Sequence, residues 1–439
     1  MLLAGVALTA APWLIRSTIL TGNPVAPLAN DLFRNPYFHL RTGSELASNM
    51  RSLHGIPPSQ VPWELAFGDR LTGTFGPLLY LLPLGLLSLG TRTGRICVGA
   101  ALILAVPWWS NTGARFLMPA AMLAAFALAM VLPRKVAWAV IALQALVCWP
   151  PLLNTWQPPY TFRLHEIPWK AAFGMETKEH YLQNHVPEYN VARMVEHYTA
   201  PDAGIFSLIP VATAYVARDI SVSWQSAGGE CLTDALNVAA KIQEQPLYDW
   251  TATWPPASLR GVRFRMPVEL SREWDLAEVQ LFSGDDRLYN SPSWSLRAWP
   301  NVWEATLAFD NRRSTVWRTW EPTRRGMFLE VDFDHAQLLS AAVLTSHNGP
   351  FEGPLEFHGQ GPDGKWRLLS NRPSASQRPP EDLRLEATGV IRRAGYQYLL
   401  VPLGPSGNGP LGKQIQEHAP QWGLVAVGNA GPNVLFKLR

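Results

Sequence analysis

Apolar runs separated by short polar connections occupy the first third of the chain. An opening run at Met1–Ala11 is followed by four more, roughly Thr74–Leu89, Ile96–Trp109, Phe116–Leu132 and Val136–Leu153. Each is slightly shorter than the roughly 20 residues that cross a bilayer upright, but they follow one another closely and carry no polar stripe. The pattern predicts a transmembrane bundle of about five helices. The alternative is an all-helical core buried within one domain.

The stretch APWLIRSTILTGNPVAPLAND, which continues the opening run, allows two interpretations. A secretory signal would end in a cleavage site here, but no Lys or Arg precedes Arg16 to supply the basic segment of such a signal. A membrane helix would instead reach its outer end here, with Trp13 and Arg16 at the lipid headgroups and a turn at Gly22-Asn23-Pro24. The four later runs favour the membrane helix.

Basic residues in the short connections predict how such a bundle is oriented. The connections at 91–95 and 133–135 each carry two basic residues, whereas the connection at 110–115 carries only Arg115. Because basic loops stay on the cytoplasmic side, the loop at 21–73 and everything after the fifth apolar run are expected on the outer side.

The rest of the chain has an ordinary density of charged residues and a mixed α/β pattern. A helical period at Tyr189–Glu196, a strand at Ile220–Trp224 and a helix at Cys231–Ile242 come first. Near the end of the chain strands alternate with a helix again, and that helix is predicted at Leu411–Ala419. Between these stretches, short strands, turn residues and many Trp predict an inserted β-sandwich.

The predicted organisation is therefore multi-domain, with an α-helical transmembrane region followed by an outer α/β domain that a β-sandwich interrupts. The helical region takes residues 1–155 with its outer loop at 21–73. The α/β domain takes 156–260 and 389–439, the sandwich 261–372, and a Ser/Pro/Arg-rich linker 373–388.

Charge and motifs exclude several classes of function. The formal net charge of +3 is small and the basic residues are dispersed, so no nucleic-acid partner is expected. The three cysteines, Cys97, Cys148 and Cys231, form no CxxC pair, and the ten histidines show no HExxH or paired spacing. No metal ligand is therefore assigned, and no motif supports a divalent metal. The chain also lacks GxGxxG, Walker and Ser-elbow motifs, so no cofactor is expected.

Two segments resemble the second half of bacterial membrane glycosyltransferases of the GT-C superfamily. They are PWLIRSTILTGNPVAPL near the start and TGARFLMPA at Thr112–Ala120, and EYNVARMVEHYTAPDAGIFS resembles the start of the domain that often follows. The resemblance implies a multi-pass protein of the bacterial inner membrane that transfers a sugar from a polyprenyl-phosphate donor. Its acceptor would be an extracytoplasmic glycan or lipid-linked molecule, and membrane lipid would be a further partner.

The catalytic carboxylate of that family comes from a first outer loop that this chain does not match. The sequence therefore resembles the C-terminal part of such an enzyme, or a reduced homologue, and its catalytic residue stays unknown. Asp31, Glu45, Glu64 and Asp69 are carboxylates of the expected outer loop that could serve by type alone.

Residues 305–366 resemble the discoidin, or F5/8 type C, sandwich, which also serves as a carbohydrate-binding module. The matching motifs are Phe309-Asp310-Asn311, Thr315-x-Trp317, Leu329–Phe333 and Asp363–Trp366. Asp310 and Trp317 are expected to be turn and core residues. Trp299, Trp303 and Trp320 are candidates to stack on a sugar, although interior packing explains most Trp in small sandwiches.

Arg115 is the strongest candidate for the lipid-linked phosphate, because a guanidinium binds two phosphate oxygens at once. Arg16 is a weaker candidate, and either arginine could instead anchor a helix at lipid headgroups. The chief alternative to a glycosyltransferase is a non-catalytic, membrane-anchored carbohydrate-binding protein in which the sandwich is the active part.

Overall fold

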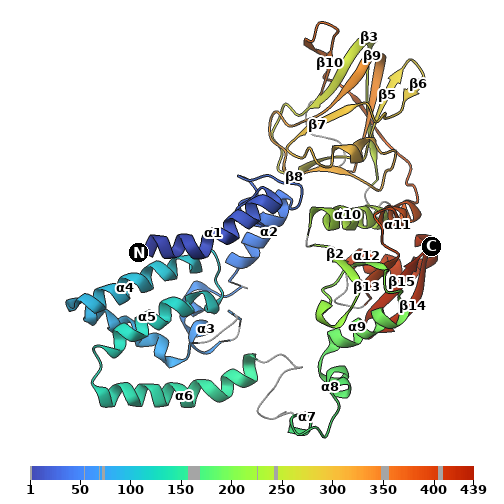
Figure 1. The fold of residues 1–439 in the computed structure, drawn as a ribbon. Helices are drawn as coiled ribbons and strands as arrows, with labels where there is room; N and C mark the ends of the chain where they lie inside the picture. Colours follow the sequence, from blue (N-terminus) through green and yellow to red (C-terminus); the bar gives the residue numbers. More distant parts are fainter. Residues whose placement is uncertain are drawn as a thin grey trace. The chain divides into compact units, whose positions relative to one another are not determined.

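The structure is a computed structural model that describes the chain apart from residues 1, 54, 69, 72–74, 157–168, 225, 242–245, 348–354 and 404–408. The chain divides into two compact units. Unit 1 combines Met1–Thr42 with Asn190–Arg439, and unit 2 is Gly43–Tyr189. Figure 1 shows the helices and strands of both units, coloured along the chain.

Unit 2 is helical, and prolines divide its apolar runs into short pieces. Helices α2 (Leu40–Arg51) and α9 (Pro187–Tyr198) cross its two boundaries with unit 1. Between them lie the α-helices α3 (Val61–Phe67), α4 (Arg92–Ala105), α5 (Met118–Ala129), α6 (Arg134–Trp156), α7 (Trp169–Ala172) and α8 (Lys178–His185). The 3₁₀ helices are η1 (Pro58–Gln60), η2 (Pro77–Tyr80), η3 (Leu82–Gly90), η4 (Val106–Trp109) and η5 (Ala114–Leu117).

The apolar runs do not form the predicted transmembrane bundle. Among the described residues, no helix combines the length and the apolar character that crossing a membrane requires. α4 has 14 residues and α5 has 12, since Pro107 follows the end of the first and Pro119 lies in the first turn of the second. The predicted transmembrane fold class, and with it the multi-pass inner-membrane location, is therefore wrong.

Helix α6, at 23 residues, shows why length alone was misleading. Gln144 lies in the middle of this helix, accepts a hydrogen bond from the backbone N–H of Leu78 at 3.0 Å and donates one to the carbonyl of Phe75. The polar side chain joins α6 to the start of η2, so it packs against protein rather than facing lipid. The run at 74–89, expected as one helix, instead contains η2 and η3.

A five-stranded sheet forms the α/β part of unit 1, and its strands come from both sides of the inserted sandwich. The strand order is β14–β15–β13–β1–β2, in which β13, β1 and β2 are parallel and β14 and β15 are antiparallel additions. The strands are β1 (Gly204–Ser207), β2 (Asp219–Val222), β13 (Tyr398–Pro402), β14 (Leu424–Ala430) and β15 (Asn433–Leu438).

Different helices cover the two faces of this sheet. In β1, Ile205 belongs to a cluster with residues of α9, whereas Phe206 packs on the other face with α10 (Ala227–Lys241), α11 (Arg384–Arg393) and α12 (Gly409–His418). Successive strand residues point to opposite faces, so both faces of the sheet are buried.

The sandwich is built on two long strands, β3 (Tyr248–Arg265) and β9 (Phe328–Ser346). They pair antiparallel, but the register shifts between Thr253 and Ala257, where Pro255 and Pro256 cannot donate hydrogen bonds to the ladder. Before this shift β3 pairs with β12 (Ser374–Gln377), and after it β3 pairs with β10 (Glu356–Gln360). Each long strand therefore contributes to two sets of neighbours.

The other elements of the sandwich enclose its core. They are β4 (Glu273–Leu276), β5 (Glu278–Ser283), β6 (Asp286–Leu288), β7 (Ser295–Trp299), η7 (Ala305–Phe309), β8 (Trp317–Pro322) and β11 (Trp366–Ser370). Trp274 and Trp317 are fully buried and meet edge to face, with ring centroids 5.1 Å apart. Residues 374–377, expected in a linker, form β12, because an exposed edge strand needs only its backbone to pair.

Arg318 on β8 joins the sandwich to the α/β domain. Its guanidinium pairs with Asp234 of α10 at 2.7 Å and with Asp275 of β4 at 3.0 Å. Burial alone would lower the pKa of Arg318, but the two carboxylates raise it above its ordinary value. The cation is thus compensated on both sides, and it holds α10 to the sandwich.

Replacing Arg318 with Met leaves two carboxylates without their cation, so we expect the free energy of unfolding to fall by about 3–5 kcal/mol. Arg367→Met is the control, since Arg367 pairs with Asp363 on the surface, where loss of a pair changes stability by about 0–1 kcal/mol. Urea unfolding followed by circular dichroism measures both variants. Equal stability of the two would contradict a joining role for Arg318.

Candidate functional site

A buried cluster of ionisable side chains in unit 1 centres on His39. The Nδ1 atom of His39 lies 2.6 Å from a carboxylate oxygen of Glu230, and its Nε2 atom contacts Oε1 of Glu304. The thiol of Cys231 donates to the same Oε1 atom over 2.9 Å. One carboxylate oxygen thus faces both an imidazole nitrogen and a thiol.

The loop at 22–39 positions His39, and three buried asparagines build this loop. Asn23 donates from its amide to the carbonyl of Leu28 at 2.7 Å and to Oδ1 of Asn30 at 3.1 Å. Asn35 donates to the same Oδ1 atom at 3.2 Å. Side-chain amides supply both donors and acceptors, so they replace the backbone ladder that an irregular segment lacks.

The partners of His39 come from two further segments. Glu230 lies in the first turn of α10 and Cys231 follows it. The N–H of Ala227, at the start of this helix, donates a hydrogen bond to the carbonyl of Tyr37 in the loop at 2.8 Å. Glu304 directly precedes η7 in the sandwich. The cluster therefore joins the loop, the α/β domain and the sandwich within one unit.

Trp320 and Asn301 hold the second oxygen of Glu304. The indole N–H of Trp320 donates to Oε2 over 2.8 Å, and the amide of Asn301 donates to the same atom. The Trp320 ring also stacks on the imidazole of His39, with centroids 4.1 Å apart and planes inclined by 13°. The indole of Trp320 therefore orients both Glu304 and His39.

The protonation of the cluster follows from these contacts. Burial opposes the charge on His39, but the hydrogen bonds to Glu230 and Glu304 outweigh it and raise the pKa of His39 to about 9. Burial raises the pKa of the Cys231 thiol well above its ordinary value, and the Glu304 charge adds to this. For Glu304, burial would raise the pKa, yet the hydrogen bonds from His39, Cys231 and Trp320 lower it. The cluster therefore favours an imidazolium at His39 beside a neutral thiol at Cys231.

The same side chains have the composition of a metal centre. One ligand atom from each of His39, Cys231 and Glu304 lies within 4.8 Å of the other two. Nitrogen, sulfur and carboxylate oxygen are the donors of protein zinc sites.

A small cavity of about 30 Å³ borders His39 and Trp320. Polar side chains of Asn30, Arg34, Asn35 and Asn301 line it together with the Trp303 ring. This volume holds about one water molecule, or one hydroxyl of a larger ligand at the rim.

The three predicted sugar-stacking tryptophans occupy different environments. Trp303 is 45% exposed and reaches the small cavity. Trp299, on β7, packs against the sandwich core, and Trp320 is buried against His39. Trp303 is therefore the most exposed of the three.

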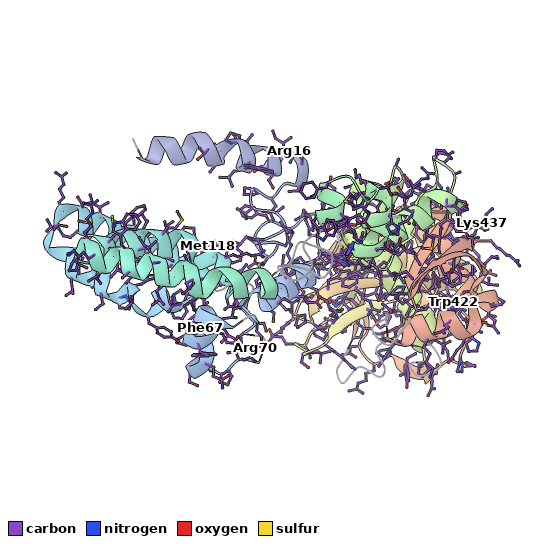
Figure 2. All side chains as sticks on the ribbon, turned by 90° about the horizontal axis from the view of Figure 1, so that it is seen from below. Arg16, Phe67, Arg70, Met118, Trp422 and Lys437 are labelled. Atoms are coloured by element: carbon purple, nitrogen blue, oxygen red, sulfur yellow. The ribbon has the colours of Figure 1, made fainter. Side chains whose placement is uncertain are left out.

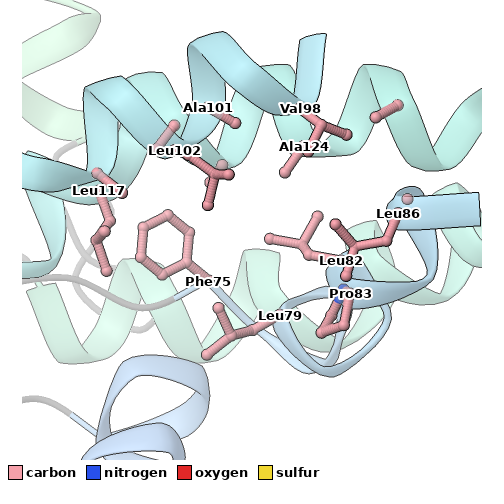
Figure 3. Close-up of a pocket in the computed structure, with 15 residues that line it drawn as sticks. Phe75, Leu79, Leu82, Pro83, Leu86, Val98, Ala101, Leu102, Leu117 and Ala124 are labelled. Carbon is pink, nitrogen blue, oxygen red and sulfur yellow. The ribbon is translucent and has the colours of Figure 1, made fainter. Parts of the chain in front are cut away.

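A larger cavity of about 370 Å³ lies in unit 2, and its walls are apolar. Side chains of η3, α4 and α5 supply most of the lining. Phe75 and Leu117 lie at one end of the cavity and Leu86 at the other (Figure 3).

The two predicted phosphate-binding arginines lie in different units. Arg115 is exposed in η5, two residues before the cavity-lining Leu117, and its guanidinium carbon is 5.0 Å from the ring centroid of Phe116. It forms no ion pair with any residue in the described part of the chain. Arg16 lies on α1 (Leu2–Thr21) (Figure 2) and is exposed. Its guanidinium carbon is 5.8 Å from the ring centroid of Trp13.

The loop carboxylates considered as catalytic by type do not converge on one site. Asp31 and Glu45 are exposed. Glu64 is buried and accepts hydrogen bonds from Arg70, which lower the pKa of that carboxyl. Asp69 lies outside the described residues.

Sequence reasoning missed His39, Glu230 and Glu304, and it left Cys231 without a role. Positions 39, 230–231 and 304 are far apart in the chain, so no local spacing marks them as a group. The adjacent Glu and Cys at the start of a predicted helix were the only local signal.

Comparisons of the chain with protein-family models, with curated proteins and with solved structures find no match. The resemblances to GT-C glycosyltransferases and to the discoidin sandwich therefore stay predictions.

Replacing His39 with Leu leaves the carboxylates of Glu230 and Glu304 facing each other without a cation, so we expect a loss of roughly 3 kcal/mol or more in unfolding free energy. Amide hydrogen exchange should also become faster in the loop at 30–41, because its anchor is removed. The control is His335→Leu, since His335 is 73% exposed and pairs only with surface groups. Unchanged exchange in the His39 variant would contradict an anchoring role.

Proposed function

We propose that the chain binds a polyprenyl-phosphate sugar and serves in the transfer of that sugar to a glycan or lipid-linked acceptor. The observation that carries the proposal is the apolar cavity of about 370 Å³ with Arg115 two residues from its lining. Its volume is in the range of small-molecule sites, roughly 300–1,000 Å³.

An isoprenoid phosphate matches both features of this part of unit 2. The hydrocarbon chain gains about 25 cal/mol for each Å² removed from water in an apolar cavity. The phosphate needs a donor outside the cavity, and the exposed guanidinium of Arg115 can bind two of its oxygens. A neutral hydrocarbon would need only the cavity, so the arginine favours a phosphorylated lipid.

Carbohydrate binding without catalysis is the second candidate function. The observation that favours it is Trp303, whose exposed ring borders a cavity lined by Arg34 and three asparagines. Aromatic faces and amide groups are the usual partners of a sugar, because they match its CH surface and its hydroxyl groups.

Filling the cavity should abolish lipid binding. Ala121 lines the cavity, and Ala121→Trp would occupy it with an indole ring. Ala125→Trp is a matched control on the same helix, because Ala125 instead lines a separate apolar pocket beside α6. A fluorescent polyprenyl-phosphate analogue, titrated by anisotropy, should bind the Ala125 variant and the original chain alike but not the Ala121 variant. Equal binding by both variants would place the lipid elsewhere.

The phosphate should be recognised by Arg115. Arg115→Gln is expected to weaken binding of the polyprenyl phosphate roughly 10- to 100-fold, the effect of losing a charged hydrogen-bond partner. It should leave binding of the uncharged polyprenol unchanged. Arg134→Gln, at another exposed arginine of unit 2, should affect neither lipid. A similar loss for both lipids in the Arg115 variant would mean that Arg115 supports the cavity and not the phosphate.

A further inference from the structure

The cluster around His39 has a donor arrangement that the proposed lipid site does not use. Nε2 of His39 and Sγ of Cys231 both contact Oε1 of Glu304, and one ligand atom of each residue lies within 4.8 Å of the other two. We propose that these three side chains bind a single Zn²⁺ ion. The inference is independent of the proposed lipid binding, because all three ligands belong to unit 1 and the lipid cavity belongs to unit 2.

The surrounding hydrogen bonds are those that orient the ligands of a metal. Nδ1 of His39 faces the carboxylate of Glu230 at 2.6 Å, and the hydroxyl of Thr42 donates to that carboxylate at 2.6 and 2.7 Å. A carboxylate on the far nitrogen of a ligating histidine directs the near nitrogen toward the metal and raises its basicity. The His39 ring is also kept in place by the stacked Trp320.

Glu304 is arranged in the same way. Trp320 and Asn301 both donate to Oε2, while Oε1 is directed toward His39 and Cys231. One oxygen is therefore held by Trp320 and Asn301, and the other contacts both the imidazole nitrogen and the thiol. An oriented carboxylate of this kind is a monodentate zinc ligand.

The donor set selects the metal. Mg²⁺ and Ca²⁺ prefer oxygen ligands only, so the thiol and the imidazole disfavour both. Zn²⁺ accepts nitrogen, sulfur and carboxylate oxygen together at about 2.0–2.3 Å in tetrahedral geometry. Such bond lengths require donors roughly 3.3–3.8 Å apart, so metal binding would move Oε1 of Glu304 away from the imidazole nitrogen and the thiol that it now contacts.

Binding is balanced in charge. The ion displaces one proton from Nε2 of His39 and one from Sγ of Cys231, and both protons pass to solvent. A divalent cation thus replaces two protons, and the buried cluster keeps its net charge. Three protein ligands leave a fourth position, which water occupies in zinc sites of this kind.

The test titrates the chelator-treated full chain with Co²⁺, which reports a bound thiolate by a charge-transfer absorption in the near ultraviolet. A single Co²⁺ per chain should produce this band, and Zn²⁺ should displace it. Cys97→Ser is the matched control, since Cys97 lies in α4 of unit 2, and it should keep the band. Cys231→Ser should lose it, and Glu304→Gln should weaken binding.

Glu230→Gln separates a metal site from a structural cluster. Its expected effect is a band of the same shape with Co²⁺ affinity weaker by roughly 10- to 100-fold, because Glu230 contacts the ligand His39 and not the metal. Circular dichroism of each variant shows whether the chain is folded. For a variant that does not fold, X-ray absorption of the zinc-loaded original chain decides, with one sulfur expected among the ligands. Absence of the band in the original chain, or an equal band in Cys231→Ser, would overturn the proposal.

Discussion

The balance of charge around His39 is the interaction on which the arrangement of unit 1 depends. An imidazolium with a carboxylate on each ring nitrogen is stable in a buried place only while both partners stay in contact. Those partners lie on α10 and before η7, so the contact can form only when the loop at 22–39, the α/β domain and the sandwich are all folded. One ring therefore makes the folding of three sequence segments interdependent.

Arg318 repeats this arrangement, since it is also a single cation between two carboxylates. It joins α10 to β4 and β8, beside the segment that carries Asn301 and Trp320. The two centres act on the same helix, since Asp234 and Glu230 are one turn apart in α10. Such pairs stabilise little in net terms, but each excludes alternative placements of α10 because any displacement would bury an uncompensated charge.

The sequence supported some elements and misled about others for identifiable reasons. The helical period at Tyr189–Glu196 indicated α9, and the alternation near the end of the chain indicated the strands β13–β15. Burial of one face of a helix or strand requires apolar residues at regular intervals, and this pattern is visible in the sequence. Apolar composition in the first third suggested long helices, but the prolines at 107 and 119 interrupt them. Apolar content measures how much surface a segment buries and does not measure how far its helix continues.

The sequence by itself determined several local elements, such as α9 and the strands near the end of the chain, and the contrast between an apolar helical part and an α/β part. Only the tertiary structure decided the cluster of His39, Cys231 and Glu304, and which of the three candidate tryptophans is the most exposed. The physical reason is range. Propensity, periodicity and capping act over a few residues, so neighbouring positions in the sequence reveal them. A site made of side chains from three distant segments forms only when packing brings those side chains within hydrogen-bond distance.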